Sequence, residues 1–472
     1  MPADTSGIID TRFRTALRRL DRAGRLLKVR SKVDPHLELA AIISKRDADQ
    51  AIFFEQVAGF SMPVCANFLA SHANVLEIFG LDVEGVRQCM LRGYAHPIPP
   101  VMVERGPCQE VVLTSGLDLE KLLPVPFHAK GDAGRTISSS IVIAKDPDTG
   151  VRNVSFHRLQ LYGGNRTGVK LDLGRHLETY YNKAKARREP LPIAVCIGTD
   201  LAVFYGAVAM GAEMPIDKDE LELAGGIKGA PIELVKCRTV PLEVPAESEI
   251  VIEGYMPPDV AVDEGPFGEF TGYNSTRMPA PVLDVTCLSH RKDPLYYTII
   301  GGERGMLRKY ILEASILSTM KKAVPIVQDV ELTPGGSVRF HLVIQVKKTL
   351  PHHEGLQRNA ILAAITSLKD LDWVVVVDHD VDIRNPLQVE WAISTRFEAS
   401  RDLILIPAAR GHEYIPVSDR GLRTKVGIDA TFTQEQMQQY DRVTFQDVDL
   451  AHYDLTNTPG LLLHPALQEP SD

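Results

Sequence analysis

The middle of the chain constrains the fold more than any other part, because it reads as a run of strands joined by tight turns. Residues 138–145 (SSSIVIAK) and 151–163 (VRNVSFHRLQLYG) have strand-like patterns. The DPDTG between them, residues 146–150, carries the Asp, Pro and Gly of a tight turn. This hairpin predicts a β-barrel or split barrel from about residue 107 to 300. Further strands are predicted at 249–256, 282–290 and 295–302, and inserted helices at 174–188 and within 217–224.

Both flanking regions mix helices with strands. An amphipathic helix is predicted over 9–29, and the apolar run WVVVVDHDVDI (373–383) is typical of a strand buried in a parallel sheet. A chain of 472 residues, at about 150 residues per domain, is expected to hold about three domains. The predicted fold class is mixed α/β, with an N-terminal α/β domain over 1–105, a central split-barrel domain over 106–300 and a C-terminal α/β domain over 301–472. Other predicted strands are 51–57, 62–69 and 338–348, and other predicted helices are 72–81, 82–94, 307–323 and 356–371.

Composition excludes several classes of protein. A net charge of -9 and a pI near 5.9 argue against a general nucleic-acid binder. No run of about 18 apolar residues predicts a membrane span, and the N-terminus has no apolar signal-peptide core. The six cysteines are scattered without a CxxC pair, which suits reduced thiols in a cytoplasmic protein and gives no zinc site.

The segment VDEGPFGEFTGY, residues 262–273, places Glu264 and Glu269 on either side of a Gly-Pro-Phe-Gly turn. Glycine lets the backbone bend and proline fixes one dihedral, so such a turn can aim two carboxylates at one point for proton transfer. Taken alone, the segment also fits a polar surface turn.

Three other polar residues could form a metal site. Asn153, His176 and Glu220 offer an amide oxygen, an imidazole and a carboxylate, a set that suits Mn²⁺ or Mg²⁺ better than zinc. Each has an ordinary alternative: a turn residue, a helix cap and a solvated helix face. The acidic run Asp378, Asp380 and Asp382 could likewise hold a metal or cap a loop.

Five separate blocks, in order, resemble the UbiD family of prenylated-FMN-dependent (de)carboxylases over nearly the whole chain. The blocks are NVSFHR (153–158), GRH (174–176), DELELAGGIKGAPIELVKC (219–237), DEGPFGEFTGY (263–273) and VDHDVDIRNPLQVEWAISTR (377–396). The resemblance implies prenylated FMN bound in the central barrel, its phosphate held through Mn²⁺ (or Mg²⁺) with K⁺ nearby, and a C-terminal domain that forms a homodimer or a higher homo-oligomer.

The resemblance also implies roles for individual residues. The catalytic network maps to Arg158, Glu264 and Glu269, and the metal ligands to Asn153, His176 and Glu220. Cofactor contacts map to those metal ligands and to Ser155, Phe156, His157, Arg158, Arg175 and Lys425, and substrate contacts to Phe270, Arg304 and Leu307.

The implied reaction is reversible, non-oxidative decarboxylation of an aromatic, heteroaromatic or α,β-unsaturated carboxylic acid. In the family mechanism the cofactor bonds to the substrate carbon, CO₂ leaves, and a general acid, here Glu269, delivers the replacing proton. Phe270 stands where ferulic-acid-type members carry Met, and Arg304 could bind a second carboxylate or lie on the surface. A flavin prenyltransferase is expected to supply the cofactor. The alternatives are a flavin-binding carrier or assembly protein with the same fold but no turnover, and a decarboxylase that uses only a metal.

Overall fold

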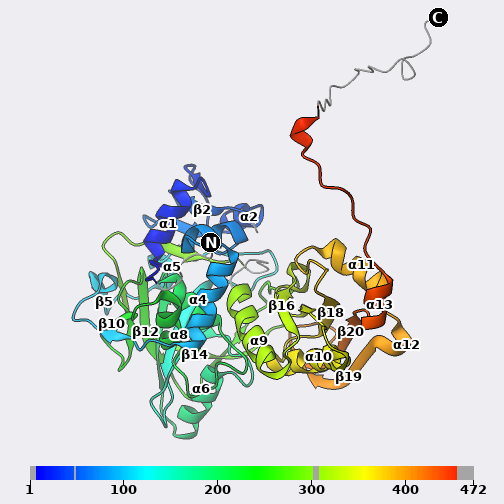
Figure 1. Ribbon diagram of the computed structural model, residues 1–472. Coiled ribbons are helices and arrows are strands. Elements are labelled where there is room, and N and C mark those ends of the chain that lie inside the picture. The colour runs from blue at the N-terminus through cyan, green and yellow to red at the C-terminus, as the bar shows by residue number, and fades with distance from the viewer. Residues whose placement is uncertain (1–6, 47–48, 301–307, 454–472) are drawn as a thin grey trace, which may run out of the picture. The chain divides into compact units, whose positions relative to one another are not determined.

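The computed structural model describes residues 7–46, 49–300 and 308–453, and it separates into two units (Figure 1). The first unit, Met1–Thr431, holds the barrel and both α/β modules. The second, Phe432–Asp472, includes the short helix α13 (Gln434–Gln439), which begins with a capping box between Thr433 and Gln436. None of the described helices is long and apolar enough to cross a membrane.

The predicted central barrel is confirmed as a closed ring of six antiparallel strands. The order is β12-β9-β6-β7-β8-β14, and β14 pairs back with β12. In β6 the register against β7 shifts between Ile137 and Ser140, so the hairpin contains a bulge. The strands are β6 (Thr136–Lys145), β7 (Arg152–Leu161), β8 (Arg166–Val169), β9 (Leu191–Ile197), β12 (Ile250–Met256) and β14 (Met278–His290); β5 (Val111–Leu113) and β13 (Ala261–Glu264) extend β14.

Helices and a small sheet surround the barrel. The predicted helices correspond to α6 (His176–Ala186) and α8 (Glu220–Lys228), and α8 runs four residues past the predicted end at 224. Helix α7 (Leu201–Val208), which is buried along its whole length, has no counterpart in the prediction. A three-stranded sheet joins β4 (Val101–Met102), β10 (Glu233–Lys236) and β11 (Glu243–Pro245), and α5 (Leu119–Leu122) is a single turn.

The N-terminal module departs from prediction at two points. The helix predicted over 9–29 is too long at both ends: α1 (Phe13–Arg22) is shorter, Gly24 takes a φ of 68°, and Leu26–Val29 forms β1. The strand β15 (Tyr296–Thr298), expected to continue the barrel, instead pairs with β3. The module's sheet is β1-β2-β3-β15, with β2 (Ala51–Phe54) and β3 (Val64–Ala66), and its other helices are α2 (Glu38–Ser44), α3 (His72–Phe79) and α4 (Val83–Ala95).

The C-terminal module is a five-stranded mixed sheet in the order β16-β17-β18-β20-β19. The strand predicted over 373–383 is confirmed in its first part as β18 (Trp373–Asp378), which is parallel to both of its neighbours; residues 379–383 form turns instead. Helix α9 (Lys309–Ala323) packs against α4 on one side and against α10 and β16 on the other (Figure 1). The remaining elements are β16 (Val327–Leu332), β17 (His341–Val346), α10 (Leu356–Ser367), α11 (Pro386–Arg396), α12 (Ala399–Asp402), β19 (Leu403–Arg410) and β20 (Leu422–Ala430).

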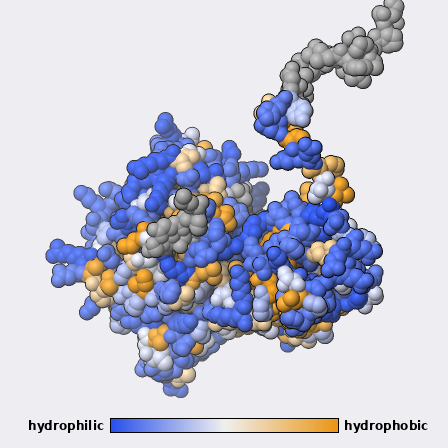
Figure 2. Space-filling model, in the orientation of Figure 1, coloured by the Kyte–Doolittle hydropathy of each residue, from blue (hydrophilic) through white to orange (hydrophobic). Residues whose placement is uncertain are grey.

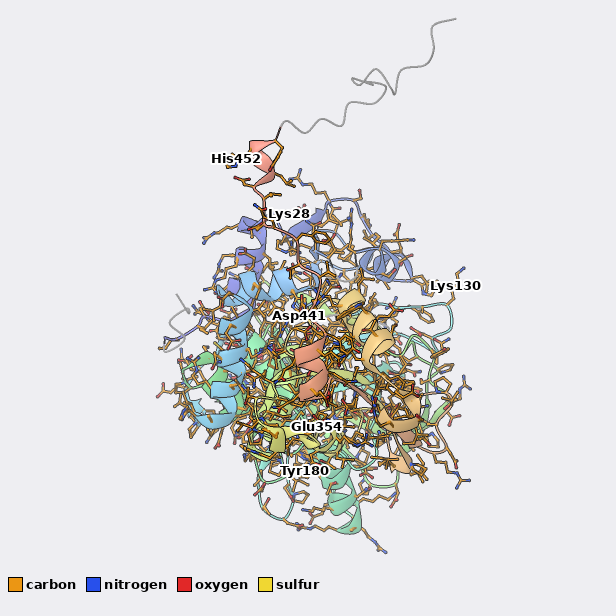
Figure 3. All side chains as sticks on the ribbon, turned by 45° about the vertical axis from the view of Figure 1, so that its right-hand side comes forward. Lys28, Lys130, Tyr180, Glu354, Asp441 and His452 are labelled. Carbon is orange, nitrogen blue, oxygen red and sulfur yellow. The ribbon has the colours of Figure 1, made fainter. Side chains whose placement is uncertain are left out.

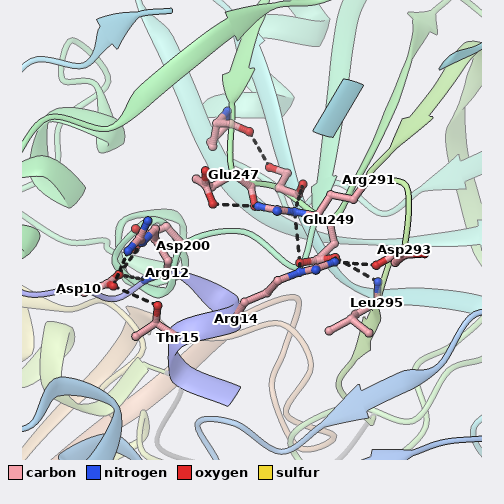
Figure 4. A network of polar contacts seen from close by, with 12 residues as sticks. Asp10, Arg12, Arg14, Thr15, Asp200, Glu247, Glu249, Arg291, Asp293 and Leu295 are labelled. Atoms are coloured by element: carbon pink, nitrogen blue, oxygen red, sulfur yellow. Dashed lines mark hydrogen bonds and ion pairs between the residues drawn. The ribbon is translucent and has the colours of Figure 1, made fainter. Parts of the chain in front are cut away.

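A buried carboxylate ties the first helix to the barrel (Figure 4). Glu249, immediately before β12, is fully buried and accepts from Arg14 Nε and Nη2 at 2.7 and 2.8 Å. Arg291 lies 3.3 Å from the same carboxylate, and the backbone N–H of Leu295 donates to it at 3.1 Å. Three segments distant in sequence therefore meet on one charge.

Over the face drawn in Figure 2, apolar side chains are scattered among hydrophilic ones rather than gathered into one patch.

Candidate active site

Two adjoining cavities, of about 170 and 270 Å³, lie between the barrel and the C-terminal module. Arg158, Glu269 and Phe270 line the first cavity, and Asn153 lines the second. The residues common to both walls are Phe156, His157, Asp172, Arg308 and Arg339.

Arg158 binds both glutamates of the Gly-Pro-Phe-Gly turn. Its Nε and Nη2 donate to the two oxygens of Glu264 at 2.6 and 2.9 Å, and its Nη1 donates to Glu269 Oε1. Glu264 is fully buried and Glu269 is 8% exposed, at the cavity wall. The guanidinium therefore anchors one carboxylate behind the wall and holds the second at the wall.

The turn between the glutamates is fixed by its own contacts. Gly265 has a φ of 80°, and an added Cβ would lie 3.0 Å from the carbonyl oxygen of Thr276, so glycine is required there. The N–H of Gly265 donates to Gln160 Oε1 at 2.9 Å, and the N–H of Gly268 donates to Asp132 Oδ1 at 3.0 Å. These bonds set the distance between the two glutamates before any ligand binds.

The surroundings raise the pKa of both Glu269 and Arg158, for different reasons. Burial raises the pKa of Glu269, and the charge of Arg158 only partly offsets this effect. Burial disfavours the charged form of Arg158, but Glu264 and Glu269 outweigh it and raise its pKa. Glu269 is thus a carboxyl group whose proton affinity is increased beside a permanent cation, as a general acid requires.

The second cavity brings Asn153, His176 and Glu220 together. The carboxylate of Glu220 lies 2.9 Å from the Asn153 amide and 3.6 Å from His176 Nδ1, and it accepts from the backbone N–H of Val154 at 2.7 Å. Glu220 is 3% exposed, and burial raises its pKa. Among the described residues, no cluster of three His, Cys, Asp or Glu forms a metal site; this set has two such residues and an amide.

Hydrogen bonds along β7 hold the Asn153 amide beside Glu220. Ser155 Oγ donates to Asn153 Oδ1 at 2.9 Å, and Asn153 Nδ2 donates to Glu220 Oε1 at 2.9 Å. His157 lies on the same strand, with Nδ1 2.9 Å from the carbonyl oxygen of Lys170 and Nε2 3.0 Å from Ser155 Oγ. Burial lowers the pKa of His157. The amide, the imidazole of His176 and the Glu220 carboxylate therefore meet at one buried point of the second cavity.

Two other predicted cofactor or substrate residues lie at the cavities. Arg175, the residue before α6, lines the second cavity and is 3.5 Å from Asp370 Oδ2. The ring of Phe270 has two guanidinium groups near it, with its centroid 5.1 Å from the guanidinium carbon of Arg308 and 5.0 Å from that of Arg339.

The structure places the remaining predicted residues elsewhere. Lys425 lies on β20, buried against Asp372 at 2.9 Å, and lines neither cavity. In the acidic run, Asp378 and Asp380 accept from Arg396. Arg304 and Leu307 lie outside the described residues.

Sequence reasoning missed several residues of the site. Arg308 and Arg339 line both cavities, and Arg339 binds Asp370 Oδ2 at 2.6 Å. The Tyr414 hydroxyl donates to Asp172, which it helps to keep ionised against the effect of burial, so the pKa of Asp172 is lowered. These residues come from segments far apart in sequence, and no local spacing marks them.

The chain matches three family models, which together cover most of it. They describe the 3-octaprenyl-4-hydroxybenzoate carboxy-lyase N-terminal domain (residues 17–90), its Rift-related domain (101–304) and its C-terminal domain (305–430). Together with the relatives below, these matches show that the protein belongs to the UbiD family of prenylated-FMN-dependent (de)carboxylases.

Relatives with similar sequence or structure span nearly the full length. The UbiD-class enzyme HmfF from Pelotomaculum thermopropionicum, in complex with FMN, is 40% identical with a TM-score of 0.88, over 93% of this chain and 99% of that one. An evolved dimeric form of that enzyme with prFMN is 38% identical with a TM-score of 0.86, over 94% of this chain and 100% of that one. Anhydromevalonate phosphate decarboxylase from Methanothermobacter thermautotrophicus is 34% identical, over 90% of this chain and 98% of the relative.

Proposed function

We propose that this protein decarboxylates an aromatic, heteroaromatic or α,β-unsaturated carboxylic acid, reversibly and without net oxidation, using prenylated FMN. The observation that carries the proposal is Glu269, a carboxyl group of raised pKa at the cavity wall, held by Arg158. A carrier or assembly protein has no need of such a proton donor. The similar HmfF structures with FMN and prFMN support the cofactor.

The residues of the second cavity fit a divalent metal. The Asn153 amide and His176 both lie at the buried Glu220 carboxylate, and an amide, an imidazole and a carboxylate are a set of ligands suited to Mn²⁺ or Mg²⁺. Asn153, His176 and Glu220 would hold the metal, which would neutralise the cofactor phosphate, with K⁺ as a further counter-ion. Ser155, Phe156, His157 and Arg175 would contact the cofactor along the cavities they line.

The chain's own residues would manage charge and protons. The prenylated flavin, when bound, supplies the carbon centre that takes up the electron pair released as CO₂ leaves. Arg158 would hold Glu269 at a fixed position while its carboxylate is ionised. After CO₂ has left, Glu269 would take up a proton from water and deliver it to the substrate carbon, where a C–H bond replaces the broken C–C bond. Glu264 remains bound to Arg158 throughout and keeps the guanidinium from rotating.

The test is reconstitution with cofactor made by a flavin prenyltransferase, followed by CO₂ release from a panel of aromatic, heteroaromatic and α,β-unsaturated acids. Glu269→Gln should retain the flavin spectrum and lose roughly 10²–10⁴-fold in turnover, because an amide cannot supply the proton. The matched control is Glu354→Gln, which changes an exposed carboxylate (Figure 3). A carrier would bind flavin and release no CO₂ from any acid, and an enzyme that uses only a metal would release CO₂ without a chromophore.

Homo-oligomerisation through the C-terminal module completes the proposal. β19 is the edge strand of the five-stranded sheet, and its Leu403 and Leu405 are 37% and 57% exposed. An edge strand with exposed leucines invites pairing with a second copy of the chain. For Arg304 and Leu307 the proposal is substrate contact, as the family resemblance implies.

A further inference from the structure

Arg308, the residue before α9, contributes to the walls of both cavities but has no carboxylate partner in the described part of the chain. The other guanidinium groups around it are paired. Arg158 binds Glu264 and Glu269, and Arg339 binds Asp370. Asp370 and Asp172 are near enough to favour the charged form of Arg308, but among the described residues neither forms an ion pair with it.

The position of the Arg308 side chain is fixed by an aromatic ring. Its guanidinium carbon lies 5.1 Å from the centroid of Phe270, whose ring also stacks on Phe340 at 5.7 Å. Phe270 directly follows Glu269, so the free cation lies on the residue next to the proposed proton donor. A guanidinium held by stacking keeps its N–H donors available for a ligand.

In the protein without a ligand, the surroundings disfavour the charged form of Arg308. Burial and the neighbouring charge of Arg339 lower the pKa of Arg308 to about 9. An anion that enters the first cavity would raise the pKa of Arg308 again, because it would pair with the buried charge. Lys170 is a second cation in the wall of the first cavity without a carboxylate partner. It is buried, its Nζ lies 5.4 Å from the Tyr414 ring, and none of the described carboxylates pairs with it.

We infer that Arg308 binds a second carboxylate of the substrate, so that the preferred substrates are ring acids that carry two carboxylates. The inference rests on the proposed function and narrows its substrate class. The substrate is favoured over the cofactor phosphate because Asn153, His176 and Glu220, the set suited to a phosphate-bound metal, line only the second cavity. Arg308 lines the first cavity as well, together with Phe270 and Glu269.

The experiment compares matched acids on one reconstituted enzyme. Five- and six-membered ring acids are each supplied as the monoacid, the dicarboxylate and the half-amide of the dicarboxylate, and kcat/KM is measured by CO₂ release. The wild type should prefer the dicarboxylate over the half-amide. Arg308→Leu should reduce this preference by roughly 30- to 1,000-fold, because it removes a buried charged contact. Arg308→Lys should keep part of it, and Arg30→Leu, whose side chain is 83% exposed, should change nothing.

The outcomes separate the inference from the function beneath it. A wild type that turns over ring acids without preferring any dicarboxylate overturns the inference and leaves the function standing, and this result does not depend on whether Arg308→Leu folds. Loss of flavin absorbance from Arg308→Leu, with an unchanged preference in the molecules still loaded, assigns Arg308 to the cofactor phosphate and overturns it as well. A wild type that is loaded with cofactor and turns over no acid removes both.

Discussion

Arg158 and Glu264 form a two-point contact, Nε and Nη2 of the arginine donating to the two carboxylate oxygens at 2.6 and 2.9 Å. The contact uses one edge of the planar guanidinium and leaves Nη1 directed at Glu269. Because Glu264 is fully buried, it determines how the arginine is turned, and through the arginine where Glu269 stands. One carboxylate thus positions the cation that positions the other.

Arg158→Lys should therefore do more harm than the retained charge suggests. A lysine ammonium cannot bind both glutamates in this geometry, so Glu269 loses its anchor and part of the attraction that lowers its pKa. We expect turnover to fall by roughly 10²-fold or more. The limb of the pH–rate profile that reports Glu269 should move to higher pH. The pKa of Glu269 rises when its contact with the cation at position 158 is weaker. A profile of unchanged position would show that Arg158 does not control Glu269. Arg30→Lys, at an exposed site, is the control.

Glu220→Ala should lose metal and flavin together. The carboxylate is the charged member of the Asn153, His176 and Glu220 set, and without it the cofactor phosphate would lack its counter-ion. Metal analysis and the flavin spectrum of one sample test this coupling. Glu222→Ala, two residues along the same helix, should keep both. Full flavin occupancy in a Glu220→Ala sample free of metal would rule the coupling out.

A charge at the edge of the C-terminal sheet should break the proposed oligomer. Leu405→Glu places a carboxylate on β19, where it would be desolvated if a second copy pairs there. We expect light scattering to show a smaller particle than for the wild type. Val112→Glu, on β5 of the barrel, should leave the mass unchanged. An oligomer of the same mass in Leu405→Glu would place the interface elsewhere.

The sequence predicts the parts of this molecule that are written in local patterns. The apolar run of β18 and the hairpin of β6 and β7 were both found from periodicity and turn residues. The junction near Gly24 was missed, because the helical pattern of α1 runs on into β1, and only the positive φ of that glycine separates them. The sequence predicts β15 as a strand of the barrel, whereas it pairs with β3, because a strand pattern does not indicate which sheet the strand will join.

Some residues of the candidate active site can likewise be predicted from the sequence, and others cannot. Asn153, Arg158 and Glu264 lie in blocks that resemble the family, so they could be named in advance. Arg308 and Arg339 reach the cavities only because the C-terminal module packs beside the barrel, and no spacing within either segment indicates this.

Glu249→Gln should destabilise the fold without touching the cavities. The carboxylate joins Arg14 of α1 to Arg291 and to the backbone of Leu295 (Figure 4). Loss of its charge leaves two arginines without their shared partner, which costs about 3 kcal/mol when the site is buried. Urea denaturation should show a lower midpoint than for Glu55→Gln, whose side chain is 37% exposed. Equal midpoints would show that the contact contributes little.

Glu331 should make stability depend on pH near neutrality. Lys309 Nζ lies 2.6 Å from Glu313 and 2.5 Å from Glu331, so two buried carboxylates share one ammonium group. Burial, and then repulsion by Glu313, raise the pKa of Glu331 to about 7. In the unfolded chain its pKa is near the ordinary value of about 4.3. The folded protein therefore binds this proton more tightly, and the stabilisation is complete below the unfolded pKa and lost as pH rises toward 7. Its size is about 3 kcal/mol.

The Glu331→Gln variant has no titratable group at this position, so its stability should not show this dependence on pH. The urea midpoint of the wild type should fall relative to that of the variant as pH rises from 5 to 8, because only the wild type must give up a proton it binds tightly. Glu354→Gln, at an exposed carboxylate, should follow the wild type at every pH. Curves for wild type and Glu331→Gln that run parallel over this range would mean that Glu331 is already ionised at pH 5 in the folded protein.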